Sequence, residues 1–316
     1  MLNYLHNHPE FNEVLRAVEH QKNIDHNLIE KDYWIMHCLY GLQQEGFEYE
    51  LKGGTSLSKG YGIIHRFSED IDIVIEPPAD MKVPTGKNHT KPAHCESRRK
   101  YYDWLADKIK IDGIKKVARD KDFDNERTYF SGGIRLYYKE SIPAAEGIKE
   151  GVLLEVGFDD VIPYKPRDIS SWAFDFAHGK GMKIKDNRAF LVRCYDPGHT
   201  FVEKLQTIVT KFRIQQETGI LPSNFMRHYY DVYCLLENDA VKNFIGTPEY
   251  EAHKKKRFPA KDQLIPLSKQ EAFQLNDPGT RKQFEGEYQK SRALYYQGQP
   301  SFEEILNLIS RNLVNL

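Results

Sequence analysis

The residues most able to do chemistry lie in two short stretches, residues 51–57 and 66–75. In the second stretch, Asp70 and Asp72 alternate with isoleucines, and the two-residue period of a β-strand places both carboxylates on one face, about 6–7 Å apart. Like charges at that spacing repel unless a cation lies between them. The pair therefore predicts a divalent-metal site, although the solvated face of an ordinary strand would give the same pattern.

The first stretch has the composition of a phosphate-binding turn. A glycine pair follows a short apolar strand, which frees backbone N–H groups to approach an anion, and two hydroxyl side chains follow at an expected helix N-terminus. An ordinary turn with a helix cap has the same composition. Because metal ligands follow shortly afterwards, the combination indicates a site for a nucleoside triphosphate, bound by Gly53, Gly54, Thr55 and Ser56.

A third carboxylate, Glu155, lies within an otherwise apolar predicted strand. A buried carboxylate that is neither paired nor metal-bound is energetically costly, so this position calls for an explanation. We expect Glu155 to join Asp70 and Asp72 as a ligand of Mg²⁺ or Mn²⁺. The alternative is an ordinary ion pair with Arg135 or with a lysine.

Arg66 and Ser68 precede the two aspartates with the same alternation, which would direct both side chains toward the side of Asp70. They are therefore candidate phosphate ligands, although Arg66 could instead pair with Glu69. The twelve histidines form no HxH or HExxH arrangement, so the sequence does not predict catalytic zinc.

Hydrophobic periodicity gives the elements that must position these residues. We expect two helices within residues 10–44, the second capped near Asp25, then a strand over 47–51, a helix over 55–61, a strand over 71–75, a mobile loop over 79–93, a long helix over 96–117, and strands over 131–138 and 152–158. Pro143 and Gly147 separate the last two strands, which favours an antiparallel hairpin.

The character of the chain changes after Pro197 and Gly198. Helices are expected over residues 200–216, 222–236, 269–276, 281–296 and 302–313. We therefore place a domain boundary near Asp196. Residues 1–195 are expected to form an α+β domain with helices packed on one face of its sheet, and residues 196–316 a helical domain.

Composition limits the remaining classes. The 316 residues, 40% hydrophobic and 29% charged, suffice for two globular domains, and a formal net charge of −1 offers no global attraction for nucleic acid. Lysine and arginine clusters at residues 110–121 and 254–257 are either local binding patches or solvated surfaces. Four scattered cysteines fit a reducing cytoplasm, and no signal peptide or membrane-spanning run is visible, so we expect a cytoplasmic protein.

The order of these segments resembles the polymerase-β-like nucleotidyltransferase superfamily, in which a glycine turn precedes an Asp-x-Asp strand. The fuller string, residues 51–57 followed by Arg66, Phe67, Ser68, Asp70 and Asp72, is similar to the AbiEii/AbiGii abortive-infection toxins of type IV toxin–antitoxin systems. Upstream, Glu30, Lys31 and Asp32 resemble the Glu-Lys-Asp helix that precedes the glycine turn in that family.

The resemblance implies a polymerase-β-like mixed sheet with flanking helices, followed by a C-terminal helical domain that completes the active-site cleft. It also implies catalytic roles for Lys204, in a Glu-Lys-Leu segment, and for Asp231, in an Arg-x-x-x-Asp-x-Tyr segment. A lysine is a suitable point charge for the triphosphate. Asp231 could equally form a surface ion pair with Arg227, one helical turn earlier.

Under this hypothesis the chain is a magnesium-dependent nucleotidyltransferase toxin that moves a nucleoside monophosphate from an NTP to RNA, with tRNA as the precedent in the family. A cognate antitoxin would act without a tight complex. Transfer to a protein or a small molecule, as in antibiotic-modifying relatives of the fold, is one alternative. A nucleotide-binding module without turnover is another.

Overall fold

The computed structural model describes residues 2–141 and 149–316. The chain divides into two compact units, the first made of Met1–Gly60 and Phe67–Tyr195 and the second of Tyr61–Arg66 and Asp196–Leu316. That residues 1–195 and 196–316 act as two functional domains stays a prediction. No helix in the described part of the chain is both long and apolar enough to cross a membrane.

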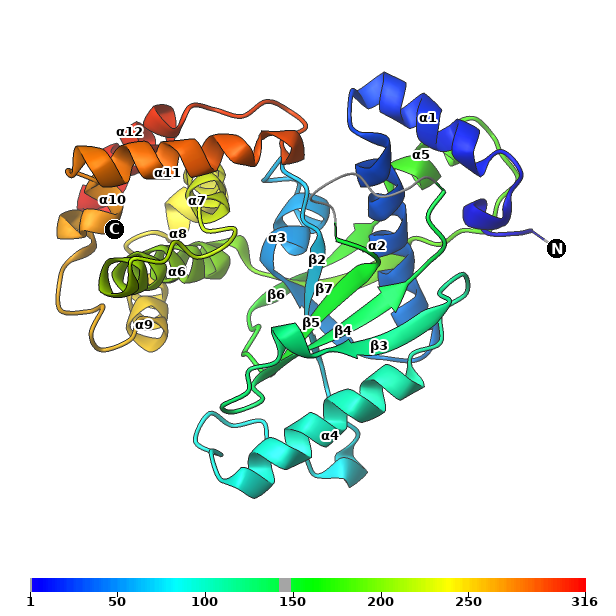
Figure 1. Ribbon diagram of the computed structural model, residues 1–316, viewed down its shortest axis with the longest axis horizontal. Helices are drawn as coiled ribbons and strands as arrows, with labels where there is room; N and C mark the ends of the chain where they lie inside the picture. The colour runs from blue at the N-terminus through cyan, green and yellow to red at the C-terminus, as the bar shows by residue number, and fades with distance from the viewer. Residues whose placement is uncertain (1, 142–148) are drawn as a thin grey trace. The chain divides into compact units, whose positions relative to one another are not determined.

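A mixed seven-stranded sheet forms the centre of the first unit, in the order β3-β4-β5-β2-β1-β7-β6 (Figure 1). The strands are β1 (Tyr49–Lys52), β2 (Asp70–Ile75), β3 (Lys116–Asp120), β4 (Ser131–Tyr137), β5 (Val152–Gly157), β6 (Tyr164–Ile169) and β7 (Ala189–Tyr195). Strand β2 runs antiparallel to β1 and parallel to β5. Strands β4 and β5 pair antiparallel, which confirms the predicted hairpin, while its connection with Pro143 and Gly147 lies outside the described residues.

The helices of the first unit are α1 (Phe11–Lys22), α2 (His26–Gln44), α3 (Gly53–Thr55), α4 (Pro92–Lys108) and α5 (Trp172–Gly179). The two N-terminal helices confirm the expected pair. Asn23 ends α1 in the left-handed conformation, with φ 53°. Asp25 then caps α2 by accepting a hydrogen bond from the Asn27 N–H at 2.9 Å.

Two of these helices cover the same face of the sheet. The Tyr49 hydroxyl on β1 donates to the Leu39 carbonyl in α2 at 2.9 Å. A Cβ at Gly132 on β4 would lie 2.6 Å from the Tyr102 ring of α4, so this glycine permits α4 to approach. The strand register places Tyr49 and Gly132 on one face, which confirms that helices pack there and leaves the other face to the site.

The long helix predicted over residues 96–117 is wrong in its second half. Helix α4 starts at Pro92 and ends at Lys108, and Lys116–Asp120 is strand β3, paired antiparallel with β4. The apolar residues Ile109 and Ile111 mimicked helical periodicity, but both are buried after the helix has ended. Strands β6 and β7 and helix α5 were also not predicted. Five of the six residues of β6 are exposed, so it lacks the alternation that marks a half-buried strand.

The second unit is helical in Asp196–Leu316, as expected. Its helices are α6 (Pro197–Thr218), α7 (Arg227–Glu237), α8 (Asp239–Phe244), α9 (Pro248–Arg257), α10 (Glu271–Gln274), α11 (Pro278–Lys290) and α12 (Phe302–Asn312). Asp196 caps α6 by accepting hydrogen bonds from two backbone N–H groups. Helix α8 was missed because its six residues are too few to show a helical period, and helix α9 because its sequence is mostly polar and gives no apolar stripe.

Candidate active site

The three predicted metal ligands lie together on the sheet face opposite α2 and α4. Asp72 on β2 pairs in register with Glu155 on the parallel strand β5, so their side chains point to the same face. Asp70 precedes Asp72 by one strand period and shares that face. Each of the three side chains is partly buried.

Burial and repulsion disfavour negative charge on Glu155 and Asp70. Burial, together with the charges of Asp72 and Asp70, raises the pKa of Glu155 to about 8. Burial also raises the pKa of Asp70, and nearby Lys149 opposes that shift. The face therefore holds more carboxylates than its positive charges compensate, which is the condition that a bound cation relieves.

The three carboxylates are suitable ligand types for Mg²⁺ or Mn²⁺, although their oxygens are not arranged around a common metal position. Carboxylate oxygens are the ligands that these hard cations prefer. One oxygen of Asp70, Oδ1, is buried and accepts no hydrogen bond from the described residues. Yet no three His, Cys, Asp or Glu side chains in residues 2–141 and 149–316 are arranged as a ready metal site. Magnesium binding by these acids therefore stays a prediction.

The glycine turn packs directly against this acidic face. Gly53 has φ 67°, a left-handed conformation, and a Cβ there would lie 1.8 Å from Oδ2 of Asp72. The Thr55 hydroxyl donates to the backbone carbonyl of Asp70 at 2.8 Å. Helical structure starts at Gly53, two residues before the expected start, and continues as a π-turn over Ser56–Gly60.

Two predicted phosphate donors of the turn face the protein. Thr55 uses its hydroxyl on the Asp70 carbonyl, as described. Ser56 is completely buried, and its hydroxyl interacts with the Cys194 thiol. Phosphate binding by the backbone N–H groups of Gly53 and Gly54 stays a prediction. Ser68 lies just before β2 and is partly exposed.

Basic side chains surround the carboxylates in a way that the motifs did not indicate. Lys52 stands opposite Asp72 in the register of β1 and β2, and its ammonium lies 2.9 Å from Asp159. Lys149 and Lys52 both counteract the raised pKa of Glu155. Pairing of Glu155 with Arg135, the alternative from the sequence, is not found. Arg135 pairs instead with Asp120, through Nε at 2.7 Å.

The other three predicted site residues form a buried ion cluster in the second unit. Arg66 donates to both carboxylate oxygens of Asp231, through Nε and Nη2, each at 2.7 Å. Lys204 on α6 reaches Oδ2 of the same aspartate at 2.8 Å. These cations hold the pKa of Asp231 well below its usual range despite complete burial.

This cluster corrects one sequence-based alternative. Asp231 is not half of a surface pair with Arg227, because its side chain is 0% exposed and is held by Arg66 and Lys204. The guanidinium of Arg66 is committed to Asp231 in a bidentate pair, the geometry in which arginine is most strongly held. The sequence could not predict the pair because its partners lie 165 residues apart.

Each basic cluster contains an arginine that forms ion pairs. Arg119 contacts Asp103 and Asp124, at 2.6 and 2.5 Å. Residues 254–257 form the last turn of α9, where Arg257 lies 3.4 Å from Glu203. Positive charge near a helix C-terminus also complements the helix dipole. These contacts favour a structural role for both arginines.

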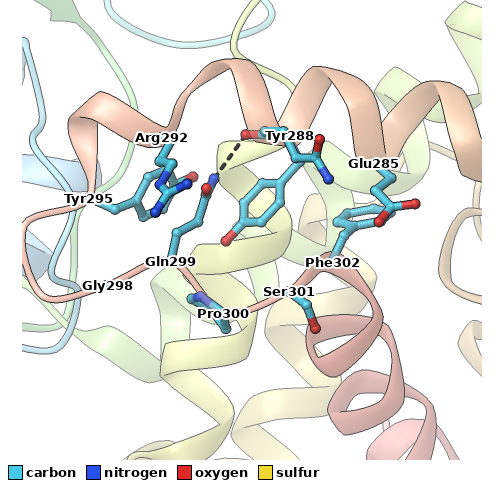
Figure 2. Close-up of a pocket in the computed structure, with 10 residues that line it drawn as sticks. Glu285, Tyr288, Arg292, Tyr295, Gly298, Gln299, Pro300, Ser301 and Phe302 are labelled. Atoms are coloured by element: carbon cyan, nitrogen blue, oxygen red, sulfur yellow. Dashed lines mark hydrogen bonds between the residues drawn. The ribbon is translucent and has the colours of Figure 1, made fainter.

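A cavity of about 720 Å³ opens in the second unit beside α11 and the start of α12 (Figure 2). Tyr288, Arg292 and Gln299 are among its lining residues, and the Gln299 amide donates to the Tyr288 carbonyl at 2.9 Å. Its lining contains none of the site residues predicted from the sequence. We therefore do not assign the nucleotide site to this cavity.

The mixed sheet, with a carboxylate strand beside a glycine turn and flanking helices, defines an α+β nucleotidyltransferase fold. A model of the family described as nucleotidyl transferase AbiEii toxin, type IV TA system, matches residues 37–308, and the chain belongs to this family. Membership confirms the resemblance seen in the sequence and implies a nucleotide substrate and an antitoxin. No curated protein and no solved structure matches the chain.

Proposed function

We propose that the protein transfers a nucleoside monophosphate from an NTP to RNA in a magnesium-dependent reaction, with a tRNA-like acceptor. Family membership supports nucleotidyl transfer by a toxin. The single observation that carries the proposal is the packing of Gly53 on Asp72, beside Asp70 and Glu155. This arrangement supports the proposal that the turn binds phosphate next to ligands for a divalent cation.

In the proposed reaction, an acceptor hydroxyl attacks the α-phosphorus of the NTP. A new P–O bond forms as the bond to the β-phosphate breaks, pyrophosphate leaves, and the hydroxyl proton passes to water. Magnesium held by Asp70, Asp72 and Glu155 would stabilise the charge on the attacking and leaving oxygens. The backbone of Gly53 and Gly54 would orient the triphosphate.

Lys204 and Asp231 keep their proposed role as residues required for transfer. In the second unit, Asp231 fixes the ammonium of Lys204 at 2.8 Å and the guanidinium of Arg66 at 2.7 Å. A lysine held by one buried partner loses little further freedom when it binds an anion. We propose that Lys204 contacts the substrate, and that Arg66 and Asp231 position the Lys204 ammonium.

The test is incorporation of each α-labelled NTP into total RNA, purified tRNA and a protein extract, with and without magnesium. Label in RNA that disappears in the Asp70→Ala/Asp72→Ala variant supports the proposal. Label found only on protein would overturn the RNA acceptor while keeping the transfer chemistry. Growth arrest on expression that survives loss of both carboxylates would show that toxicity does not come from catalysis.

The antitoxin is proposed to act without a stable complex. Co-expression of the toxin with the product of a neighbouring gene, followed by affinity purification, tests this point. Restored growth without co-purification is the expected result. Stoichiometric co-purification would contradict it.

A further inference from the structure

Three consecutive charged residues on α2 are almost completely buried. Glu30, Lys31 and Asp32 are only 2%, 1% and 2% exposed. Charged side chains are rarely buried to this extent unless they are paired, because losing water is costly. What each of the three binds therefore shows what the segment holds in place.

Asp32 holds the far end of the glycine turn. One of its oxygens lies 2.6 Å from the ammonium of Lys59, within the π-turn Ser56–Gly60. Its other oxygen accepts a hydrogen bond from the backbone N–H of Trp172 at 2.8 Å. The Lys59 ammonium lies 4.2 Å from the centroid of the Trp172 ring. Lys59 is thus bound by a carboxylate and an aromatic face together. The near end of the same turn, Gly53, packs on Asp72.

Glu30 and Lys31 hold two backbone points that precede strand β5. The Glu30 carboxylate accepts the Ser141 N–H at 3.0 Å and the Ser141 hydroxyl at 2.6 Å. The Lys31 ammonium donates to the Lys149 carbonyl. Glu30 and Lys31 therefore fix the backbone at Ser141 and at Lys149, which lies shortly before β5.

We propose that Glu30, Lys31 and Asp32 are positioning residues for the nucleotide site. Asp32 acts through Lys59 to keep the glycine turn in the conformation that meets Asp72. Lys31 holds the Lys149 carbonyl and Glu30 holds Ser141, so the two residues fix the backbone before β5, the strand that carries Glu155. This inference rests on the proposed nucleotide-binding function, and it assigns to this segment the preorganisation of that site.

The first test measures the turn itself, with no ligand present. Amide hydrogen exchange of the full-length protein is compared among wild type, Asp32→Asn and Lys59→Met. Both variants are expected to speed exchange in peptides covering residues 53–60 at least tenfold. The double variant is expected to be no faster than the faster single variant, because both changes break the same contact.

Asp124→Asn provides the matched control. Asp124 is another buried partner of a cation, with a side chain 5% exposed and 2.5 Å from Arg119. This variant is expected to lower the thermal midpoint comparably while leaving exchange over residues 53–60 unchanged. Equal protection of residues 53–60 in Asp32→Asn and in wild type would overturn the proposal.

The second test measures binding of a non-hydrolysable ATP, GTP, CTP or UTP analogue with magnesium, by calorimetry below the thermal midpoint of each variant. Whichever analogue binds wild type is expected to bind Asp32→Asn and Lys31→Met at least tenfold more weakly, and Asp124→Asn as tightly as wild type. Equal affinity in all of the variants would overturn the positioning role. If wild type binds no analogue, the proposed function fails, and the exchange experiment still decides whether the segment holds the turn.

Discussion

Gly53 and Asp72 are in direct contact, and no residue larger than glycine fits between them. A Cβ at Gly53 would lie 1.8 Å from Oδ2 of Asp72, and the backbone there has φ 67°. Both the space and the conformation therefore require glycine. The turn and the carboxylate strand, which the sequence suggested as two separate binding elements, form one packed unit.

Gly53→Ala is the sharpest test of that contact. The methyl group must displace the Asp72 carboxylate, and the left-handed backbone adds about 1–2 kcal/mol of strain. We expect nucleotide transfer to fall at least a hundredfold and unfolding free energy to fall by about 2 kcal/mol. Transfer assays and urea denaturation measure the two effects.

Gly46→Ala is the control for backbone strain. Gly46 also has a positive φ, 81°, but a Cβ there would meet no atom within 4 Å. We expect a similar strain cost of about 1–2 kcal/mol with unchanged transfer activity. Equal losses of activity in the two variants would show that the contact with Asp72 has no functional role.

Removal of the third carboxylate should weaken the response to magnesium. Glu155→Gln keeps the size of the side chain but can no longer ionise to bind a cation beside Asp72. We expect the magnesium concentration for half-maximal transfer to rise about tenfold, and chelation of divalent cations to abolish transfer in wild type. Titration of activity with magnesium checks both. An unchanged magnesium requirement in Glu155→Gln would remove Glu155 from the ligand set.

Asp231→Asn should be strongly destabilising. The change removes the negative charge that Arg66 and Lys204 share at a completely buried position. Breaking a buried pair in this way typically costs about 3–5 kcal/mol. Asp239→Asn, at an exposed pair with Lys242, is the control and should cost less than about 1 kcal/mol. Urea denaturation at neutral pH compares them.

The cluster of Arg66, Lys204 and Asp231 also predicts how the free energy of unfolding changes at acidic pH. Because Arg66 and Lys204 lower the pKa of Asp231 in the folded protein, its contribution to stability is complete above the unfolded-state pKa, near pH 4. It is lost as the pH falls further toward the lower, folded-state pKa. The stability gap between wild type and Asp231→Asn should therefore narrow below about pH 4. A gap that stays constant down to pH 2 would contradict the ion-pair assignment.

Buried His37 should cause a second loss of stability, at a less acidic pH. It is 1% exposed, and its ring nitrogens contact the Asp112 carbonyl and the Asn187 amide at 3.0 Å each. Burial lowers the pKa of His37 from 6.5 to about 4. Unfolding therefore becomes easier as the pH falls from 6.5 to 4, by up to about 3 kcal/mol from this residue.

Denaturation of wild type and His37→Gln across this range measures the contribution of His37. The variant should be less stable at pH 7 because it replaces the buried His37 ring. It should lose less stability on acidification because glutamine has no titrating group. Parallel curves for the two proteins would show that His37 does not control the step. Other buried histidines, among them His253, contribute equally to both curves.

Local sequence determined the parts of the fold that depend on short-range patterning. The alternation of Asp70 and Asp72 with isoleucines specified both strand β2 and its acidic face, since side chains alternate along any strand. The cap at Asp25 and the glycine turn at Gly53 were readable because each depends on neighbours within a few residues. The place of Glu155 beside Asp72 followed from the need to satisfy a carboxylate in an apolar strand.

Only the tertiary structure decided which distant groups satisfy one another. Arg66 pairs with Asp231 and Asp32 with Lys59, although the sequence suggested Glu69 and Arg227 as partners for the first pair and gave no partner for Asp32. An ion pair depends on where two chain segments meet in space. From the sequence alone, any residue of opposite charge nearby in the chain is an equally suitable partner. Sequence thus determined the chemical groups and the faces that carry them, whereas packing determined their partners, because burial makes the choice of partner costly to change.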